Sequence, residues 1–106
     1  MRNYLAGIMT CVLILSASLA GAAELTVSQK KRNFKPNVLN AKLGDTVLFV
    51  NDDRYPHNLS SKSPGFEFDV RKQMPGGKYS MKLDKRGRFQ IDCVIHPRMK
   101  MTVNVE

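Results

Sequence analysis

Residues 88–106 read RFQIDCVIHPRMKMTVNVE, and this stretch decides the fold class. Apolar and polar side chains alternate at both of its ends, and the apolar members are Phe89, Ile91, Cys93, Met101, Val103 and Val105. A period of two is typical of a β-strand with one buried face. The loop between the two predicted strands contains a thiol, an imidazole and a thioether. The sequence therefore predicts two strands joined by a loop that offers soft ligands to a metal.

The same alternation recurs in two other stretches, residues 25–28 and residues 79–84. Residues 46–50 (TVLFV) are apolar without interruption, which is typical of a central strand. A further short strand is predicted around residues 66–70. Residues typical of turns separate these stretches, namely Pro36, Gly44, Gly65, Gly76 and Gly87. No stretch after residue 23 has a helical period, so we expect a single all-β domain, either a β-sandwich or a small barrel.

The start of the chain has the features of an export signal. A basic residue precedes residues 5–19 (LAGIMTCVLILSASL), which have no charge, and Ala20-Gly21-Ala22 offers the small residues that a signal peptidase recognises. We expect cleavage after Ala22, which gives a signal peptide at residues 1–22 and a mature domain at residues 23–106. The alternative is an uncleaved membrane anchor, because the apolar stretch is just long enough to span a bilayer. Neither alternative is cytoplasmic.

The chain is strongly basic, with 17 lysines and arginines against nine acidic residues and a formal net charge of +8. No helix-turn-helix, zinc-finger or RNA-binding signature accompanies this charge, so we expect no nucleic-acid partner. The basic residues concentrate at residues 30–32, 71–72 and 85–88. They are interpreted as a solvated surface, or as a surface that attracts an acidic partner protein or a membrane.

Cysteine and histidine usage points to a metal centre. Removal of the signal peptide takes away Cys11 and leaves Cys93 as a lone thiol in an oxidising compartment. His96 lies three residues after it, two methionines follow closely, and His57 is the other histidine of the chain. A thiolate, two imidazoles and a weak thioether are the ligand set of an electron-transfer copper site, because this set suits both Cu(I) and Cu(II).

Other interpretations of these residues remain open at this point. Cys93 could be an inert buried thiol, which is the common fate of a free cysteine. A structural zinc site is a second alternative, but zinc usually takes four ligands from cysteine, histidine and carboxylates. The chain offers three such ligands, since alternation turns Asp92 outward, and copper binds more tightly than zinc to a site of this kind.

Three stretches, together with residues 93–99, resemble the small blue-copper (type 1) cupredoxins, the family of amicyanin, plastocyanin and pseudoazurin. They are Phe34-Lys35-Pro36, residues 43–47 (LGDTV) and residues 49–58 (FVNDDRYPHN). Residues 93–99 (CVIHPRM) are similar to the short amicyanin-type loop. The resemblance covers nearly all of the predicted mature chain. It implies a cupredoxin-like Greek-key β-sandwich of eight strands with one copper ion at one end.

The resemblance also implies roles for individual residues. His57 and His96 would bind the copper ion through ring nitrogens, and Cys93 would bind it through its thiolate. Asn58 would lie in the second coordination shell and tie the two ligand-bearing segments together. Met99 lies where the short amicyanin-type loop places its axial ligand. Met101 is the alternative axial ligand, because the longer plastocyanin-type loops place theirs there, but alternation explains Met101 as a core residue, and Met99 is preferred.

A function follows from the resemblance. It implies a bacterial periplasmic electron carrier, not an enzyme, that passes single electrons between larger redox proteins through the exposed edge of His96, framed by Pro56 and Pro97. We expect a monomer whose partner is a cytochrome, a dehydrogenase or an oxidase with an acidic docking surface. We expect no stable membrane insertion after signal cleavage. The alternative is a periplasmic copper carrier or tolerance protein on the same scaffold.

The chain departs from the family pattern in three places. Val94-Ile95 replaces the usual polar-proline pair before the second histidine, and Asp92 stands where an aromatic residue is common. The interval from His57 to Cys93 is also short for the family. These departures leave the fold and the metal unchanged but affect the expected reduction potential and partner surface.

Overall fold

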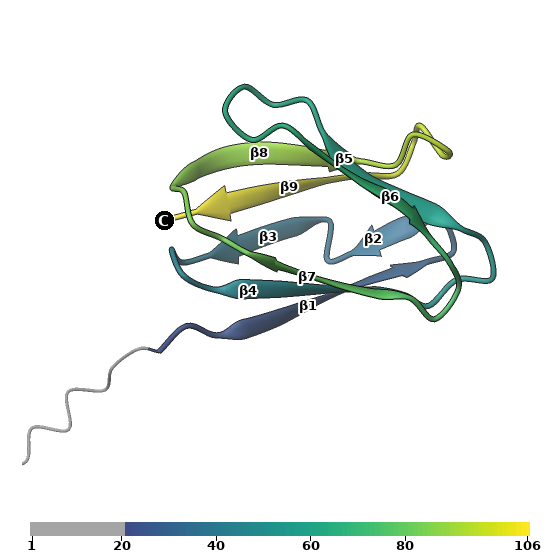
Figure 1. The fold of residues 1–106 in the computed structure, drawn as a ribbon, viewed down its shortest axis with the longest axis horizontal. Helices are drawn as coiled ribbons and strands as arrows, with labels where there is room; N and C mark the ends of the chain where they lie inside the picture. The colour runs from purple at the N-terminus through teal and green to yellow at the C-terminus, as the bar shows by residue number, and fades with distance from the viewer. Residues whose placement is uncertain (1–20) are drawn as a thin grey trace, which may run out of the picture.

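The structure, a computed structural model, describes residues 21–106, which form nine strands in two sheets packed face to face (Figure 1). The strands are β1 (Glu24–Lys30), β2 (Asn33–Lys35), β3 (Val38–Ala41), β4 (Thr46–Asn51), β5 (His57–Ser61), β6 (Phe68–Gln73), β7 (Lys78–Lys82), β8 (Gly87–Asp92) and β9 (Lys100–Val105). The predicted all-β sandwich is confirmed. The predicted signal peptide falls almost entirely on residues outside the described part.

The first sheet has the strand order β2-β1-β4-β7, and the second has the order β3-β9-β8-β5-β6. β1 pairs with β4 and β3 pairs with β9 in parallel, while the other pairs are antiparallel. The chain changes from the first sheet to the second between β2 and β3, at the turn that Pro36 signals. The structure therefore has nine strands rather than the eight that the resemblance implies, because the segment of β2 and β3 is divided between the two sheets.

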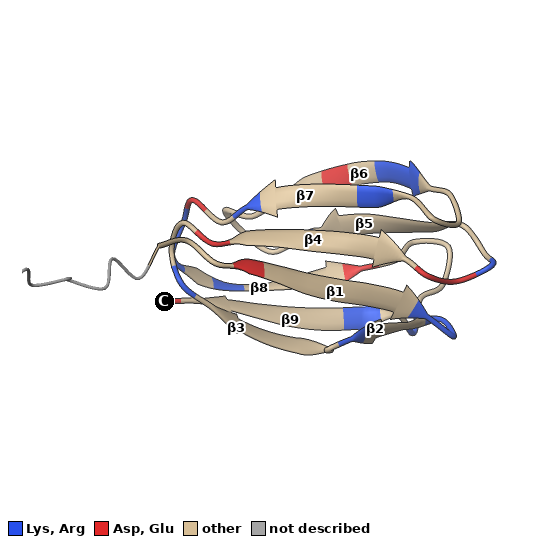
Figure 2. Cartoon of the chain, turned by 90° about the horizontal axis from the view of Figure 1, so that it is seen from below, with Lys and Arg blue, Asp and Glu red and all other residues tan. Residues whose placement is uncertain are grey.

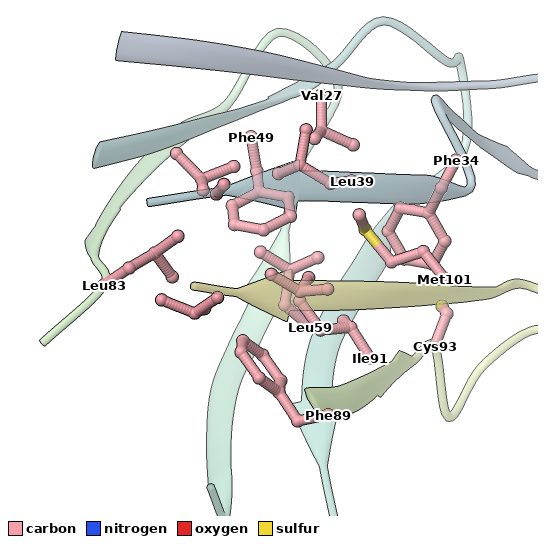
Figure 3. Packing of buried hydrophobic residues seen from close by; sticks show 14 of the residues in the cluster. Val27, Phe34, Leu39, Phe49, Leu59, Leu83, Phe89, Ile91, Cys93 and Met101 are labelled. Carbon is pink, nitrogen blue, oxygen red and sulfur yellow. The ribbon is translucent and has the colours of Figure 1, made fainter. Parts of the chain in front are cut away.

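Alternating side chains of both sheets form a single core (Figure 3). In β8 and β9 the residues predicted to face inward are all buried, and their neighbours are more exposed. Burial of each large apolar side chain contributes about 1.5–3 kcal/mol to folding. Cys93 is 1% exposed and lies at the edge of this core, directly after β8. The thiol is thus held where the packed interior meets a loop.

Four connections meet at one end of the sandwich, which we name the ligand end. They are the β1–β2 turn, the loop at residues 52–56, the loop at residues 74–77 and the loop at residues 93–99. They meet there because β1, β4, β6 and β8 all run toward this end. All of the predicted ligands lie at this end or at the strand ends next to it.

The opposite end is fastened by a carboxylate. Asp45, just before β4, accepts hydrogen bonds from the backbone N–H groups of Ala23 and Lys42, both at 2.9 Å. The bond from Ala23 ties the start of β1 to the start of β4, and both bonds lower the pKa of the Asp45 carboxyl. Among residues 21–106, no helix has the length and apolar character that crossing a membrane would require.

Candidate metal centre

The structure brings His57, Cys93 and His96 together, although His57 lies 36 residues before Cys93. The Nδ1 atoms of the two histidines are 3.0 Å apart. The Cys93 Sγ lies 3.8 Å from His57 Nδ1 and 3.9 Å from His96 Nδ1. Three ligand atoms of the expected types therefore face one point, one from the start of β5 and two from the loop at residues 93–99.

Local structure explains why these side chains converge. β5 and β8 are neighbours in the second sheet, with Ser60 opposite Asp92, so the start of β5 lies beside the end of β8. The loop after β8 is closed by backbone hydrogen bonds from His96 N to Cys93 O at 3.2 Å, and from Cys93 N to Met99 O at 3.1 Å. This tight loop returns His96 to within reach of the thiol.

The spacing of the three atoms fits a metal ion. Metal bonds measure about 2.0 Å to an imidazole nitrogen and about 2.3 Å to a thiolate sulfur. No pair of the donor atoms is further apart than two such bonds together, so one ion could touch all three. The donor set of two nitrogens and one sulfur is the equatorial set of a blue-copper site. Copper bound there would supply a one-electron redox couple.

Asn58 links the two segments that hold these ligands. Its side-chain Oδ1 accepts a hydrogen bond from Val94 N at 2.6 Å. Its backbone N–H donates to Cys93 Sγ at 3.4 Å. The residue is buried, so water does not compete for these bonds. These are the contacts that a residue fixing Cys93 relative to His57 would make.

Asp53, which the sequence does not single out, also contacts the cluster. Its Oδ2 lies 3.0 Å from His57 Nε2, on the side of the ring opposite Nδ1. His57 can donate its Nε2 proton to this carboxylate, which leaves the lone pair of Nδ1 free for a metal. The only signal in the sequence was the spacing of an aspartate four residues before the histidine, which is not specific to metal sites.

Hydrogen bonding governs the charge of Asp53. Burial alone would raise the pKa of this carboxyl, but the hydrogen bonds from Arg32 N, His57 and Arg54 N outweigh burial and lower the pKa. The pKa of His96 is also lowered, mainly by burial and then by the neighbouring His57. A neutral His96 ring is the form that binds a metal, so this shift favours ligation at neutral pH.

Both candidate axial methionines are buried. Met99 is 1% exposed in the loop, and Met101 is 2% exposed in β9. Met101 alternates with Val103 in the inward-facing row of β9, and Figure 3 shows it packed within the core, near Cys93. Met99 lies inside the loop that also contains Cys93 and His96, and its N–H donates to His96 O at 2.8 Å.

Exposed apolar residues lie beside His96. Val94 is 63% exposed, Ile95 is 45% exposed and Tyr55 is 38% exposed. The Tyr55 and His96 rings are in edge contact, with centroids 6.3 Å apart. His96 itself is only partly buried, whereas His57 and Cys93 are almost fully buried. The cluster therefore reaches the surface through one ligand ring.

Comparison with known proteins agrees with this geometry. Residues 21–106 match the family model of copper-binding proteins of the plastocyanin/azurin family. The chain belongs to this family, which confirms the resemblance to blue-copper cupredoxins and identifies copper as the cofactor.

Individual relatives are similar over most of the chain. Amicyanin-alpha of Methylorubrum extorquens is 36% identical over 90 residues, which cover 82% of this chain and 74% of the relative. Plastocyanin of Pisum sativum is 30% identical over 96 residues, which cover 79% of this chain and 56% of the relative.

Solved structures share the fold. The structure of a reduced mutant of amicyanin has a TM-score of 0.74 and 27% identity, and the match covers 82% of this chain and 84% of that one. A copper-containing nitrite reductase from Thermus scotoductus has a TM-score of 0.73 and 29% identity. That match covers 78% of this chain but 22% of the enzyme.

Proposed function

We propose that this protein is a periplasmic electron carrier that passes single electrons between larger redox proteins. Its copper ion would be bound by His57 Nδ1, Cys93 Sγ and His96 Nδ1, with a methionine as a weak axial ligand. The observation that carries the proposal is the convergence of these three donor atoms at the edge of a packed core. Electron transfer through such a site makes and breaks no covalent bond.

The surroundings of the cluster suit repeated oxidation and reduction. The Cys93 thiol is bound by a backbone N–H, and Asp53 and Asn58 hold the two ligand-bearing segments. Ligands fixed in this way change position little when the charge of the metal changes. Hydrogen bonds to the sulfur and exclusion of water also tune the reduction potential. The protein part of the site thus favours fast transfer over chemistry on a substrate.

We further propose that electrons pass through the ring edge of His96. It is the ligand that reaches the surface. The exposed residues Val94 and Ile95 precede it in the loop, and the exposed Tyr55 ring contacts it. An apolar face lets a second protein approach closely without large desolvation costs. The carrier would act as a monomer and would meet its partners, a cytochrome, a dehydrogenase or an oxidase, at this face.

Location follows from the first residues of the chain. We propose that residues 1–22 are a signal peptide removed after Ala22 and that residues 23–106 act in the periplasm. This location suits a lone thiol that is held by a metal rather than by a disulfide.

We propose Met99 as the axial ligand. It belongs to the same closed loop as Cys93 and His96, whereas the position of Met101 is explained by its alternation with Val103 in β9. The alternative, a copper carrier on the same scaffold, would have to use Met74, which is 57% exposed in the loop at residues 74–77, because Met99 and Met101 are both buried.

Visible absorption and voltammetry of the copper-loaded protein test this function. We expect an intense thiolate-to-Cu(II) absorption band and reversible one-electron cycling with the metal retained. Cys93→Ser should abolish the band, because the charge-transfer donor is removed. Facile loss of Cu(I) to a chelator, without reversible cycling, would instead support a copper carrier. A colourless protein that prefers zinc would contradict both proposals.

The two methionines form a matched pair of variants. Met99→Leu should change the Cu(II) spectrum and raise the reduction potential, because the thioether stabilises Cu(II) more than an alkyl group does. Met101→Leu should keep the spectrum and cost less than about 1.5 kcal/mol of stability, since the swap conserves core volume. The reverse pattern would assign the axial position to Met101.

A further inference from the structure

The turn between β1 and β2 has a strained backbone. Lys31 and Arg32 form a two-residue turn between the paired residues Lys30 and Asn33, with φ angles of 52° and 58°. Residues with side chains adopt this left-handed conformation at a cost in free energy, because Cβ comes close to a backbone carbonyl oxygen. Turns of this kind normally use asparagine and glycine. Two long basic residues therefore occupy positions where folding favours small ones.

A carboxylate at the ligand end holds this turn in place. The backbone N–H of Arg32 donates to Asp53 Oδ2 at 2.9 Å, and the N–H of Arg54 donates to Asp53 Oδ1 at 3.0 Å. Asp53 is the same residue that contacts the candidate ligand His57. The strained turn is thus fixed relative to the metal centre.

The fixed turn puts Arg32 on an exposed aromatic ring, and Arg54 from the loop after β4 lies near the same ring. The Arg32 guanidinium carbon lies 4.7 Å from the centre of the Tyr55 ring, and the Arg54 guanidinium carbon lies 5.9 Å from it. Tyr55 in turn touches the ring of His96. We name the group of Arg32, Tyr55 and Arg54 the arginine clamp. It lies directly beside the ligand that reaches the surface.

Positive charge gathers around this clamp. Figure 2 shows lysine and arginine at the β1–β2 turn, at the end of β6 and at the start of β9 on the ligand end, whereas acidic and basic residues are mixed at the opposite end. Acidic residues also lie at the ligand end: Asp52 and Asp53 in the loop after β4, and Asp92 at the end of β8. The Asp53 side chain is only 8% exposed and accepts several hydrogen bonds, while the Asp52 carboxylate accepts one from the Ser28 hydroxyl.

We propose that the arginine clamp binds carboxylates on the surface of the redox partner and seats that partner on Tyr55, beside His96. This inference rests on the proposed electron-transfer function. Guanidinium groups bind carboxylates through paired hydrogen bonds, and the Tyr55 ring keeps them in position before binding. A protein fits better than an anionic membrane, because a lipid surface at the clamp would cover His96 without supplying an electron donor or acceptor.

Because the turn is strained, one variant should raise the thermal stability and lower the affinity for acidic partners. The double variant Lys31→Asn/Arg32→Gly gives the turn its preferred residues and should raise the melting temperature. The same variant removes the clamp's first arginine and should weaken binding of acidic partners. The matched control is Arg86→Gln/Arg88→Gln, which removes the same charge from exposed positions at the opposite end.

The binding probe is a hexaglutamate peptide titrated into the Cu(I)-loaded protein and followed by NMR. We expect the largest signal changes at Arg32, Tyr55 and Arg54, and their loss in high salt. The turn variant should bind roughly tenfold more weakly, and the opposite-end control should change by less than about twofold. Equal weakening in both variants, or signal changes away from the clamp, would overturn the proposal.

A redox assay separates this inference from the proposed function. The reduced protein gives one electron to anionic ferricyanide or to the cationic tris(phenanthroline)cobalt(III) ion, with no bond made or broken. The turn variant should react more slowly with ferricyanide and faster with the cobalt complex, whereas the control should match the parent. If all variants react alike, the clamp is refuted and the carrier function stands. If the parent reacts with neither reagent, the carrier function fails, and the clamp fails with it.

Vesicles of phosphatidylglycerol provide the last comparison. The copper-loaded protein should bind them no more strongly than the opposite-end control does. Clamp-dependent binding to the vesicles without binding to the peptide would overturn the proposal and assign the surface to a membrane.

Discussion

A single carboxylate, that of Asp53, connects the candidate metal centre to two surface segments. It contacts His57 Nε2 and accepts backbone N–H groups of Arg32 and Arg54. An imidazole whose second nitrogen is held by a carboxylate keeps one orientation and one tautomer. We therefore regard Asp53 as a positioning residue that acts on the metal through His57.

Replacement of Asp53 tests this role. Asp53→Ala should weaken copper binding by about 10- to 100-fold, because the His57 ring loses the group that orients it. The dissociation constant can be measured by competition with a copper chelator. Asp52→Ala is the control, since Asp52 is exposed and bonds to Ser28 instead. Equal copper affinity in the two variants would show that Asp53 does not position the ligand.

At the scale of elements, buried amides join the two sheets near the ligand end. Gln73 of β6 donates from Nε2 to Phe49 O at 3.2 Å and to Gly77 O at 2.9 Å. Its Oε1 accepts from Gln29 Nε2 at 2.6 Å. Asn51 Nδ2 donates to Gln73 O at 3.0 Å. β6 belongs to the second sheet, whereas β1 and β4 belong to the first, so these bonds cross between the layers.

Gln73→Leu should therefore destabilise the fold by about 2–4 kcal/mol, because it leaves buried polar groups of the first sheet without a partner. Urea denaturation followed by circular dichroism measures this loss. Gln90→Leu serves as the comparison, since Gln90 is exposed on β8 and its side-chain Nε2 donates to Asp92 Oδ1 at the surface. A loss no larger than that of Gln90→Leu would mean that solvent replaces the cross-layer bonds.

The elements differ in how well the sequence predicts them. β8 and β9 were predicted because their alternation continues over several residues with a clear contrast between the faces. β2 and β3 were not predicted, since they have three and four residues and the chain changes sheets between them. The strand expected around residues 66–70 is real but runs from Phe68 to Gln73. Residues 46–50 look continuously apolar, yet β4 buries alternate residues.

The candidate site, too, can be predicted from the sequence only in part. The spacing of Cys93 and His96 in one loop is visible in the sequence, and the pairing of β5 with β8 brings His57 beside them. Asp53 was missed, because an acidic residue in a polar loop has no distinguishing pattern until the loop folds back. From the sequence the β1–β2 turn is interpreted as a charge cluster, because Lys31 and Arg32 replace the glycine or asparagine that signals a hairpin turn.

At the scale of the whole molecule, the lowered pKa of Asp45 determines part of the pH dependence of folding stability. Hydrogen bonds from Lys42 N and then Ala23 N lower the pKa of its carboxyl in the folded state. The unfolded chain then binds a proton at Asp45 more readily than the folded chain does. Stability from this carboxylate is therefore present above the usual pKa of an aspartate and is lost as the pH falls through the lowered pKa.

We expect Asp45→Asn to be less stable than the parent at neutral pH, with a difference that shrinks as the pH falls below about 4. Thermal unfolding at a series of pH values measures the difference. Asp84→Asn, which removes a carboxylate from an exposed position of the same end, is the control. A gap between Asp45→Asn and the parent that is independent of pH would contradict the assignment.

The bond from Ala23 to Asp45 also bears on the signal cleavage that we propose. Peptide cleavage after Ala22 would replace the Ala23 amide with a free ammonium group at the same atom, and a charge-assisted bond of this kind is about twice as strong as a neutral one. A cut one residue away would leave the ammonium group out of register with the carboxylate. Molecules cut after Ala22 would then be more stable than molecules cut elsewhere. Degradation would therefore remove the wrongly cut molecules first.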